Sequence, residues 1–126
     1  MLRPALALFV LSFPAAAETV APDYYAEALF AVSTAETLVN FCPEIGLDTA
    51  ALNTAAEAVL NRLADDGIGG DAIVSLSGVE PAVAELQAAF TERHGLSEPS
   101  ESAICAAARA EMAEGSAIGQ ILTEAE

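Results

Sequence analysis

The chain has 126 residues, with 19 acidic residues against four arginines, no lysine, and a formal net charge of −15 at pH 7. Binding to nucleic-acid phosphates depends on lysine and arginine, so this composition excludes a nucleic-acid partner and disfavours docking onto anionic lipid. The length is that of one domain.

The first 17 residues have the pattern of a secretory signal peptide. Arg3 precedes an apolar run from Ala5 to Phe13, and a stretch of small residues ends at Ala17. The apolar run is about ten residues long, well short of the roughly twenty that span a bilayer. We predict cleavage after Ala17, export to the periplasm, and a single helical domain over residues 18–126 without a membrane span. An uncleaved membrane anchor is the alternative.

Two helices are predicted in the first half of this domain. Alanine supplies 24 of the 109 residues after the predicted cut, and alanine is the best helix former. Apolar residues recur at three- and four-residue spacing from Tyr25 to Cys42, which predicts a helix that Pro43 ends. A second helix is predicted from the N-cap Asp48 to the C-terminal glycine Gly67.

A third helical segment is predicted from the N-cap Asp71 to His94. Gly78 and Pro81 interrupt it, because proline lacks the amide hydrogen that a helix interior requires. The sequence leaves open whether this segment is one kinked helix or two abutting helices. A short strand over "AIVSLSGV" is a less favoured alternative.

A fourth helix is predicted to begin near Pro99 or Ser100 and to run to Leu122, with Gly115 as a potential break in one long apolar stripe. The segments together predict an all-α fold, a compact bundle of four to five helices. The two cysteines, Cys42 and Cys105, are predicted to form one disulfide, as is usual in exported proteins. Buried free thiols and a redox pair are the alternatives, although neither cysteine has the cationic neighbours of a reactive thiol.

The segment "LADDGIGGDAI" contains three aspartates and three glycines within residues 65–71. It fails as an EF-hand loop because glycine or leucine stands at three of the essential ligand positions. We interpret it as a turn in which Gly67 ends one helix and Asp71 caps the next. A non-standard divalent-cation site that uses Asp65, Asp66 and Asp71 is the alternative.

The fourth predicted helix contains a G-x-x-x-G motif. In a chain without a membrane span, this motif indicates that a helix approaches another backbone closely, either within the core or at a partner. The candidate docking residues are Arg109, Met112, Gly115, Ile118, Gly119 and Leu122.

Catalytic machinery is not indicated. His94 is the only histidine, and its position at a predicted helix C-terminus suits the helix dipole. No nucleophile with a neighbouring base can be assembled from the sequence. We therefore predict a non-enzymatic protein without a cofactor or a catalytic residue.

Three stretches carry a resemblance to a known family: "ALFAVSTAETLVNFCPEI", "DDGI" and "CAAARAEMAEGSAIGQIL", within residues 25–122. They resemble small exported helical proteins of Alphaproteobacteria, chiefly Rhodobacter relatives, catalogued as domain of unknown function 5333. The chain departs from that family at Ile68, where an aromatic residue is expected, and at Gly69 and Gly70.

The resemblance implies no activity, cofactor or catalytic residue. It implies gene neighbours that encode respiratory complexes, and hence an accessory role. We therefore expect a periplasmic interaction module or accessory subunit with an unknown protein partner, with a membrane respiratory complex as its implied setting.

Overall fold

Five α-helices follow the alanine-rich segments of the chain. The computed structural model describes residues 19–126, so the predicted signal peptide, residues 1–17, lies outside the described residues. The bundle prediction is confirmed, with the addition of one 3₁₀ helix and a small sheet that the sequence did not predict. The elements are α1 (Asp23–Phe41), β1 (Ile45–Leu47), α2 (Thr49–Asp65), α3 (Asp71–Val74), α4 (Val79–Arg93), α5 (Glu101–Glu114), η1 (Gly119–Ile121) and β2 (Leu122–Glu124).

The ends of α2 lie where the sequence predicts them. The Asp48 carboxylate accepts a hydrogen bond from the Ala51 amide at 3.0 Å, which caps the first turn. At the other end Gly67 has a φ of 79°, and the Ile68 amide donates to the Leu63 carbonyl at 2.8 Å. This Schellman motif satisfies carbonyls that a helix end leaves free.

The third predicted segment is two helices, α3 and α4, rather than one kinked helix. Pro81 lies in the first turn of α4, where a missing amide hydrogen costs nothing, and this position ends any continuous helix before it. Gly70, with a φ of 55°, is the N-cap of α3. The prediction of Asp71 as N-cap is therefore wrong, because Asp71 is the first helical residue and makes no capping hydrogen bond.

The fourth predicted helix, α5, ends at Glu114 and does not continue to Leu122. Gly115 adopts a φ of 64°, and the Ser116 amide donates to the Glu111 carbonyl at 3.3 Å, which closes the helix end. The chain then turns back through η1 and adds β2 antiparallel to β1. The expected break at Gly115 is thus a complete reversal of the chain.

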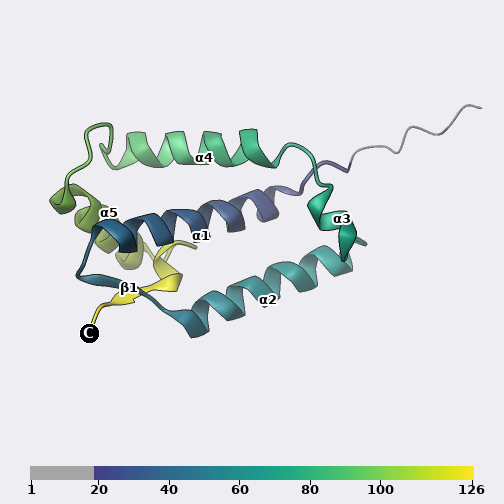
Figure 1. Ribbon diagram of the computed structural model, residues 1–126, viewed down its shortest axis with the longest axis horizontal. Helices are drawn as coiled ribbons and strands as arrows, with labels where there is room; N and C mark the ends of the chain where they lie inside the picture. Colours follow the sequence, from purple (N-terminus) through teal and green to yellow (C-terminus); the bar gives the residue numbers. More distant parts are fainter. Residues whose placement is uncertain (1–18) are drawn as a thin grey trace, which may run out of the picture.

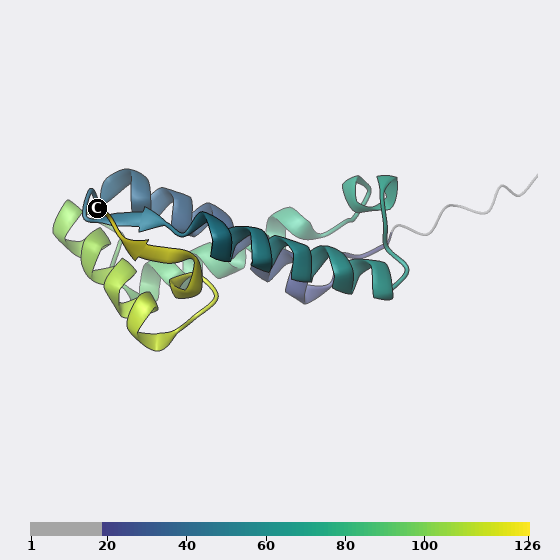
Figure 2. The same cartoon turned by 90° about the horizontal axis from the view of Figure 1, so that it is seen from below.

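Helix α1 lies between α4 and α2, as Figure 1 shows, and it also contacts α5, β1 and η1. Helix α5 and the two-stranded sheet lie at one end of this layer, and α3 stands at the opposite end (Figure 2). The predicted disulfide is confirmed: Cys42 and Cys105 are bonded, with their Cα atoms 5.3 Å apart. No helix within residues 19–126 is long and apolar enough to cross a membrane.

Most of the core lies at one end of the molecule. We call this end the closed end; it comprises the C-terminal halves of α1 and α4 with α5, η1, β1 and β2. Its buried residues form one cluster: Ala31, Ala35, Leu38, Cys42, Ile45, Phe90, Ala107, Ala108, Ile118, Ile121 and Leu122.

We call the other end the open end; it comprises the N-terminal halves of α1 and α4, the C-terminal half of α2, and α3. Ala26 and Leu63 are buried there, but α3 buries no residue. The apolar faces of its helices are consequently only partly covered.

Candidate functional site

A buried carboxylate lies at the closed end. Glu111 is 1% exposed, and it is the buried charged residue of the described chain. It follows Ile104, Ala107 and Ala108 at helical spacing, so it occupies the core-facing side of α5. Nothing in the predicted site residues singled it out among the 19 acidic residues of the chain. A glutamate at i+3, i+4 and i+7 from three small or apolar residues was the available signal.

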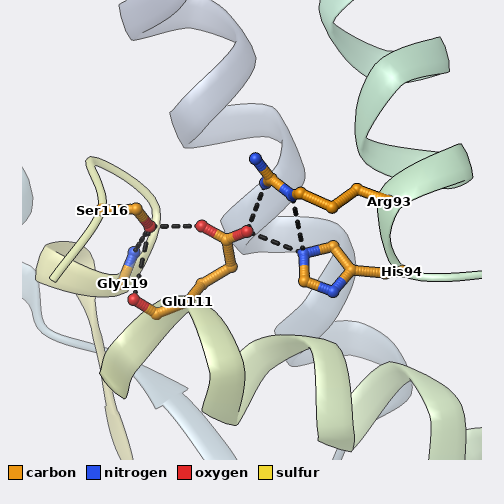
Figure 3. A network of polar contacts seen from close by, with 5 residues as sticks. All are labelled: Arg93, His94, Glu111, Ser116 and Gly119. Carbon is orange, nitrogen blue, oxygen red and sulfur yellow. Dashed lines mark hydrogen bonds and ion pairs between the residues drawn. The ribbon is translucent and has the colours of Figure 1, made fainter. Parts of the chain in front are cut away.

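Three side chains satisfy this carboxylate (Figure 3). Arg93 and His94, at the C-terminal end of α4, both contact one carboxylate oxygen of Glu111, the His94 Nε2 atom at 2.7 Å. The Ser116 hydroxyl contacts the other oxygen. The same hydroxyl accepts a hydrogen bond from the Gly119 amide at 3.0 Å. We call these four side chains the Glu111 cluster.

Gly119 permits the close approach that the G-x-x-x-G motif predicts. A Cβ atom at this position would lie 2.0 Å from the Glu111 carbonyl oxygen and 2.8 Å from the Cα atom of Met112. Both are backbone atoms, so neither can move aside as a flexible side chain does. The motif therefore packs η1 against the last turns of α5.

The environment of Glu111 holds it in its charged form. Burial alone would raise the pKa of this carboxyl group. Hydrogen bonds from Ser116 and His94 and the positive charge of Arg93 act in the opposite direction and prevail, so the pKa lies below its ordinary value.

The order of contacts in the Glu111 cluster differs from that of a nucleophilic triad. In a triad a histidine takes the proton from the serine hydroxyl, and the carboxylate stands behind the histidine. Here the carboxylate lies between His94 and Ser116, and both contact it directly. The cluster thus acts as a clamp that joins the end of α4 to the end of α5 and to η1.

Only part of the predicted docking stripe reaches the surface. Ile118, Gly119 and Leu122 are buried in the core of the chain itself, and Met112 is half-buried against that core. The core-packing alternative therefore describes these residues. Gly115 is exposed at the end of α5.

Arg109, the remaining residue of the predicted docking stripe, forms ion pairs with two residues of the chain itself. Its guanidinium contacts Glu124 of β2 at 2.5 Å and Glu44, just before β1, at 3.1 Å. These exposed ion pairs bring α5 to both strands of the sheet. Each contributes little to stability, because water screens exposed pairs.

The three carboxylates of the turn at residues 65–71 do not lie close together. Asp66 accepts a hydrogen bond from the Tyr24 hydroxyl at 2.6 Å, and Asp71 lies on α3 beyond two glycines. Asp65, Asp66 and Asp71 do not form a group with ligand atoms close enough to share a metal ion. Within residues 19–126, the one such group is Cys42, Glu44 and Cys105, whose sulfurs are joined in the disulfide.

Two surface grooves lie at opposite ends of the molecule. The closed-end groove, of about 540 Å³, runs between α1, α4 and the start of α5, and Leu38, Phe41 and Phe90 contribute to its lining. The open-end groove, of about 490 Å³, is lined by one tyrosine of α1 and by residues of α3, of the turn that follows, and of α4: Tyr25, Ile73, Val74, Leu76, Gly78, Val79, Glu80 and Pro81.

In a comparison with known families, the model of a family of unknown function, DUF5333, matches residues 19–123. The chain belongs to DUF5333. This is a family of unknown function, so the match confirms the family that the sequence resembles and adds no activity. No curated protein and no solved structure matches the DUF5333 chain.

Proposed function

We propose that this protein is a non-enzymatic, exported interaction module, an accessory subunit that binds a positively charged, apolar segment of a partner protein at its open end. The observation that carries this proposal is the combination of exposed apolar side chains and predominantly acidic charge at the open end. The family resemblance makes a membrane respiratory complex the first setting in which to search for the partner.

Exposed apolar side chains at the open end supply the contact surface. Val74 of α3 is 87% exposed and lines the open-end groove beside Tyr25 and Val79. On the amphipathic helix α2, the apolar residue Leu60 is 53% exposed. Exposed apolar side chains beside a groove mark interaction sites, and their burial drives association.

Charge selects the kind of partner. From Ala64 to Glu92 the sequence has six acidic residues and no basic residue, and Glu80 lines the open-end groove itself. The three described arginines are engaged within the chain, at Glu111, at Glu44 and Glu124, and over the ring of Tyr24. A basic partner is attracted by this surface, whereas anionic lipid or a second copy of the chain is repelled.

Export is part of the same proposal. The Cys42–Cys105 disulfide is of the kind that persists in oxidising compartments. Thr19, the second residue after the predicted cut, takes part in the fold, because the Ser77 amide donates to the Thr19 carbonyl at 2.9 Å. The match to the family likewise begins at residue 19. Cleavage after Ala17 would leave this pairing intact.

Site-specific photo-crosslinking tests the proposal. A benzophenone amino acid replaces Val74 at the open end or, as a matched control, the exposed residue Glu114 at the closed end. Each variant is expressed in the native host, and crosslinked proteins are identified from the exported fraction and the membrane. We expect a basic partner to be crosslinked from position 74 and not from position 114.

Two results would contradict this function. One is equal crosslinking from the two positions, which would indicate random encounters. The other is the absence of any specific product at position 74 in cells that export the protein in its disulfide-bonded form.

A further inference from the structure

We propose that the closed-end groove binds an uncharged, mainly apolar small molecule that carries a carbonyl or hydroxyl group. This inference is separate from the proposed interaction with a protein, since the closed-end groove and the open-end groove share no lining residue. It rests on the size of the groove, on its charge, and on the polar side chains at its rim.

The groove has the size and the floor of a ligand pocket. Its volume of about 540 Å³ falls within the range of pockets that hold drug-sized molecules, roughly 300–1,000 Å³. Leu38 of α1 and Phe90 of α4 form a buried apolar floor, and both belong to the core cluster. The floor is therefore held by the best-packed part of the molecule. The Phe41 ring is 59% exposed, so an apolar ligand beside it would cover surface that water now contacts.

The lining is almost free of charge. Glu101 is the one charged residue among the thirteen that line the groove, although the chain has 19 acidic residues. An anionic ligand placed on this apolar floor would lose hydration without gaining a partner of opposite charge, and a cationic ligand would lose hydration against a single carboxylate, that of Glu101. An uncharged ligand loses far less hydration, so the groove discriminates in its favour.

Three polar side chains on facing helices remain available for hydrogen bonding. At the rim, the hydroxyls of Ser33 and Thr37 donate to carbonyls of their own helix. By contrast, the hydrogen bonds between described residues do not involve the side chains of Thr34, Gln87 or Thr91, which also line the groove. Thr34 lies on α1, and the other two lie on α4. Their hydroxyl and amide groups match a carbonyl or hydroxyl on the ligand.

The test uses the full exported chain and a neutral naphthalene ketone dye, 6-propionyl-2-(dimethylamino)naphthalene, followed by its fluorescence. We expect saturable binding with one site. The anionic dye 8-anilinonaphthalene-1-sulfonate, which has a similar ring system, should bind at least tenfold more weakly. Comparable affinity for the two dyes would overturn the proposal, as would the absence of saturable binding of the neutral dye.

A matched pair of variants locates the bound dye. Thr37→Trp fills the groove, and Thr54→Trp places the same side chain on the surface of α2. The two threonines are equivalent otherwise, because both are exposed and each hydroxyl donates to the carbonyl four residues earlier. We expect Thr37→Trp to weaken binding at least tenfold and Thr54→Trp to leave it unchanged. Equal effects would place the dye elsewhere and refute the assignment.

The isosteric variant Thr91→Val tests the polar part of the ligand description. It keeps the shape of the groove and removes one hydroxyl, so affinity for the ketone dye should fall about fivefold, the worth of one hydrogen bond. Unchanged affinity in Thr91→Val, Thr34→Val and Gln87→Leu alike would overturn the requirement for a carbonyl or hydroxyl group.

Discussion

The closed and open ends are built from similar helices but differ in what covers them. At the closed end, α5 and the residues that follow it cover α1, and the buried cluster spans residues 31–122. At the open end, no element within residues 19–126 takes the place of α5, and the apolar residues Val74 and Leu60 stay exposed. The apolar face of a helix needs a covering element, and at the open end this cover is incomplete. Stability is concentrated at one end and the proposed binding of a protein at the other.

Removal of the Cys42–Cys105 disulfide at the closed end should cause the largest loss of stability. In Cys42→Ala/Cys105→Ala the unfolded chain regains the freedom of a long loop, because the bonded residues are 63 positions apart. We expect the free energy of unfolding to fall by about 4 kcal/mol. Urea unfolding followed by circular dichroism measures it.

The control is Val74→Ser at the open end, where the side chain is exposed and the change should stay within about 0.5 kcal/mol. A double variant that loses less than about 1 kcal/mol would show that the closed end does not depend on its covalent link.

Alanine substitutions at two glycines, one at each end of the molecule, compare the packing of the two ends directly. Gly119→Ala places a methyl group against the backbone of α5, and we expect it to lower the free energy of unfolding by about 3 kcal/mol. At Gly69 of the open end a Cβ atom meets nothing within 4 Å, and the φ angle is not positive. Gly69→Ala should therefore be neutral or slightly stabilising. Thermal melts of both variants decide the matter, and similar melting temperatures would refute the close approach at Gly119.

The Glu111 cluster should give a smaller and pH-dependent effect. Glu111→Gln removes the carboxylate charge from the hydrogen bonds with Arg93, His94 and Ser116, and we expect a loss of about 2 kcal/mol at pH 7. The matched control is Glu114→Gln, an exposed residue of the same helix, which should change stability by less than about 0.5 kcal/mol.

Acid should abolish the difference between Glu111→Gln and the natural chain. The folded-state pKa of Glu111 is lowered from its ordinary value of 4.5. The carboxylate therefore stabilises the fold fully above that value, and the contribution is lost as the pH falls through the folded-state pKa. Urea unfolding between pH 7 and pH 3 measures this convergence. A constant difference in the free energy of unfolding down to pH 3 would show that the charge of Glu111 does not stabilise the fold.

Local signals in the sequence were sufficient for the helices and for their best-defined ends. Asp48 and Gly67 bound α2 as predicted, since capping depends on residues within one turn. The G-x-x-x-G motif indicated a close backbone approach, and the disulfide followed from the cysteine count. At Asp71 the same local reasoning was wrong, because the neighbouring Gly70 adopts the cap conformation instead.

Features that depend on distant residues could not be predicted in the same way. β1 and β2 have three residues each and lie more than 70 positions apart, so neither forms a recognisable strand pattern alone. The buried position of Glu111 depends on its contacts with Arg93 and His94 at the end of another helix, and the sequence of α5 does not indicate these contacts. The two grooves likewise arise where several helices meet, and no single segment indicates them.

The return of the chain through residues 118–122 has a consequence for folding. Ile118, Ile121 and Leu122 complete the core around α1, which was made about ninety positions earlier in synthesis. A growing chain therefore cannot close its core until these late residues exist, because the contacts of Ile118, Ile121 and Leu122 with α1 join residues far apart in the sequence. Long-range contacts of this kind form more slowly than the local contacts within a helix. A chain that stays open until its synthesis is nearly complete is also one that can be threaded through a narrow channel before it folds.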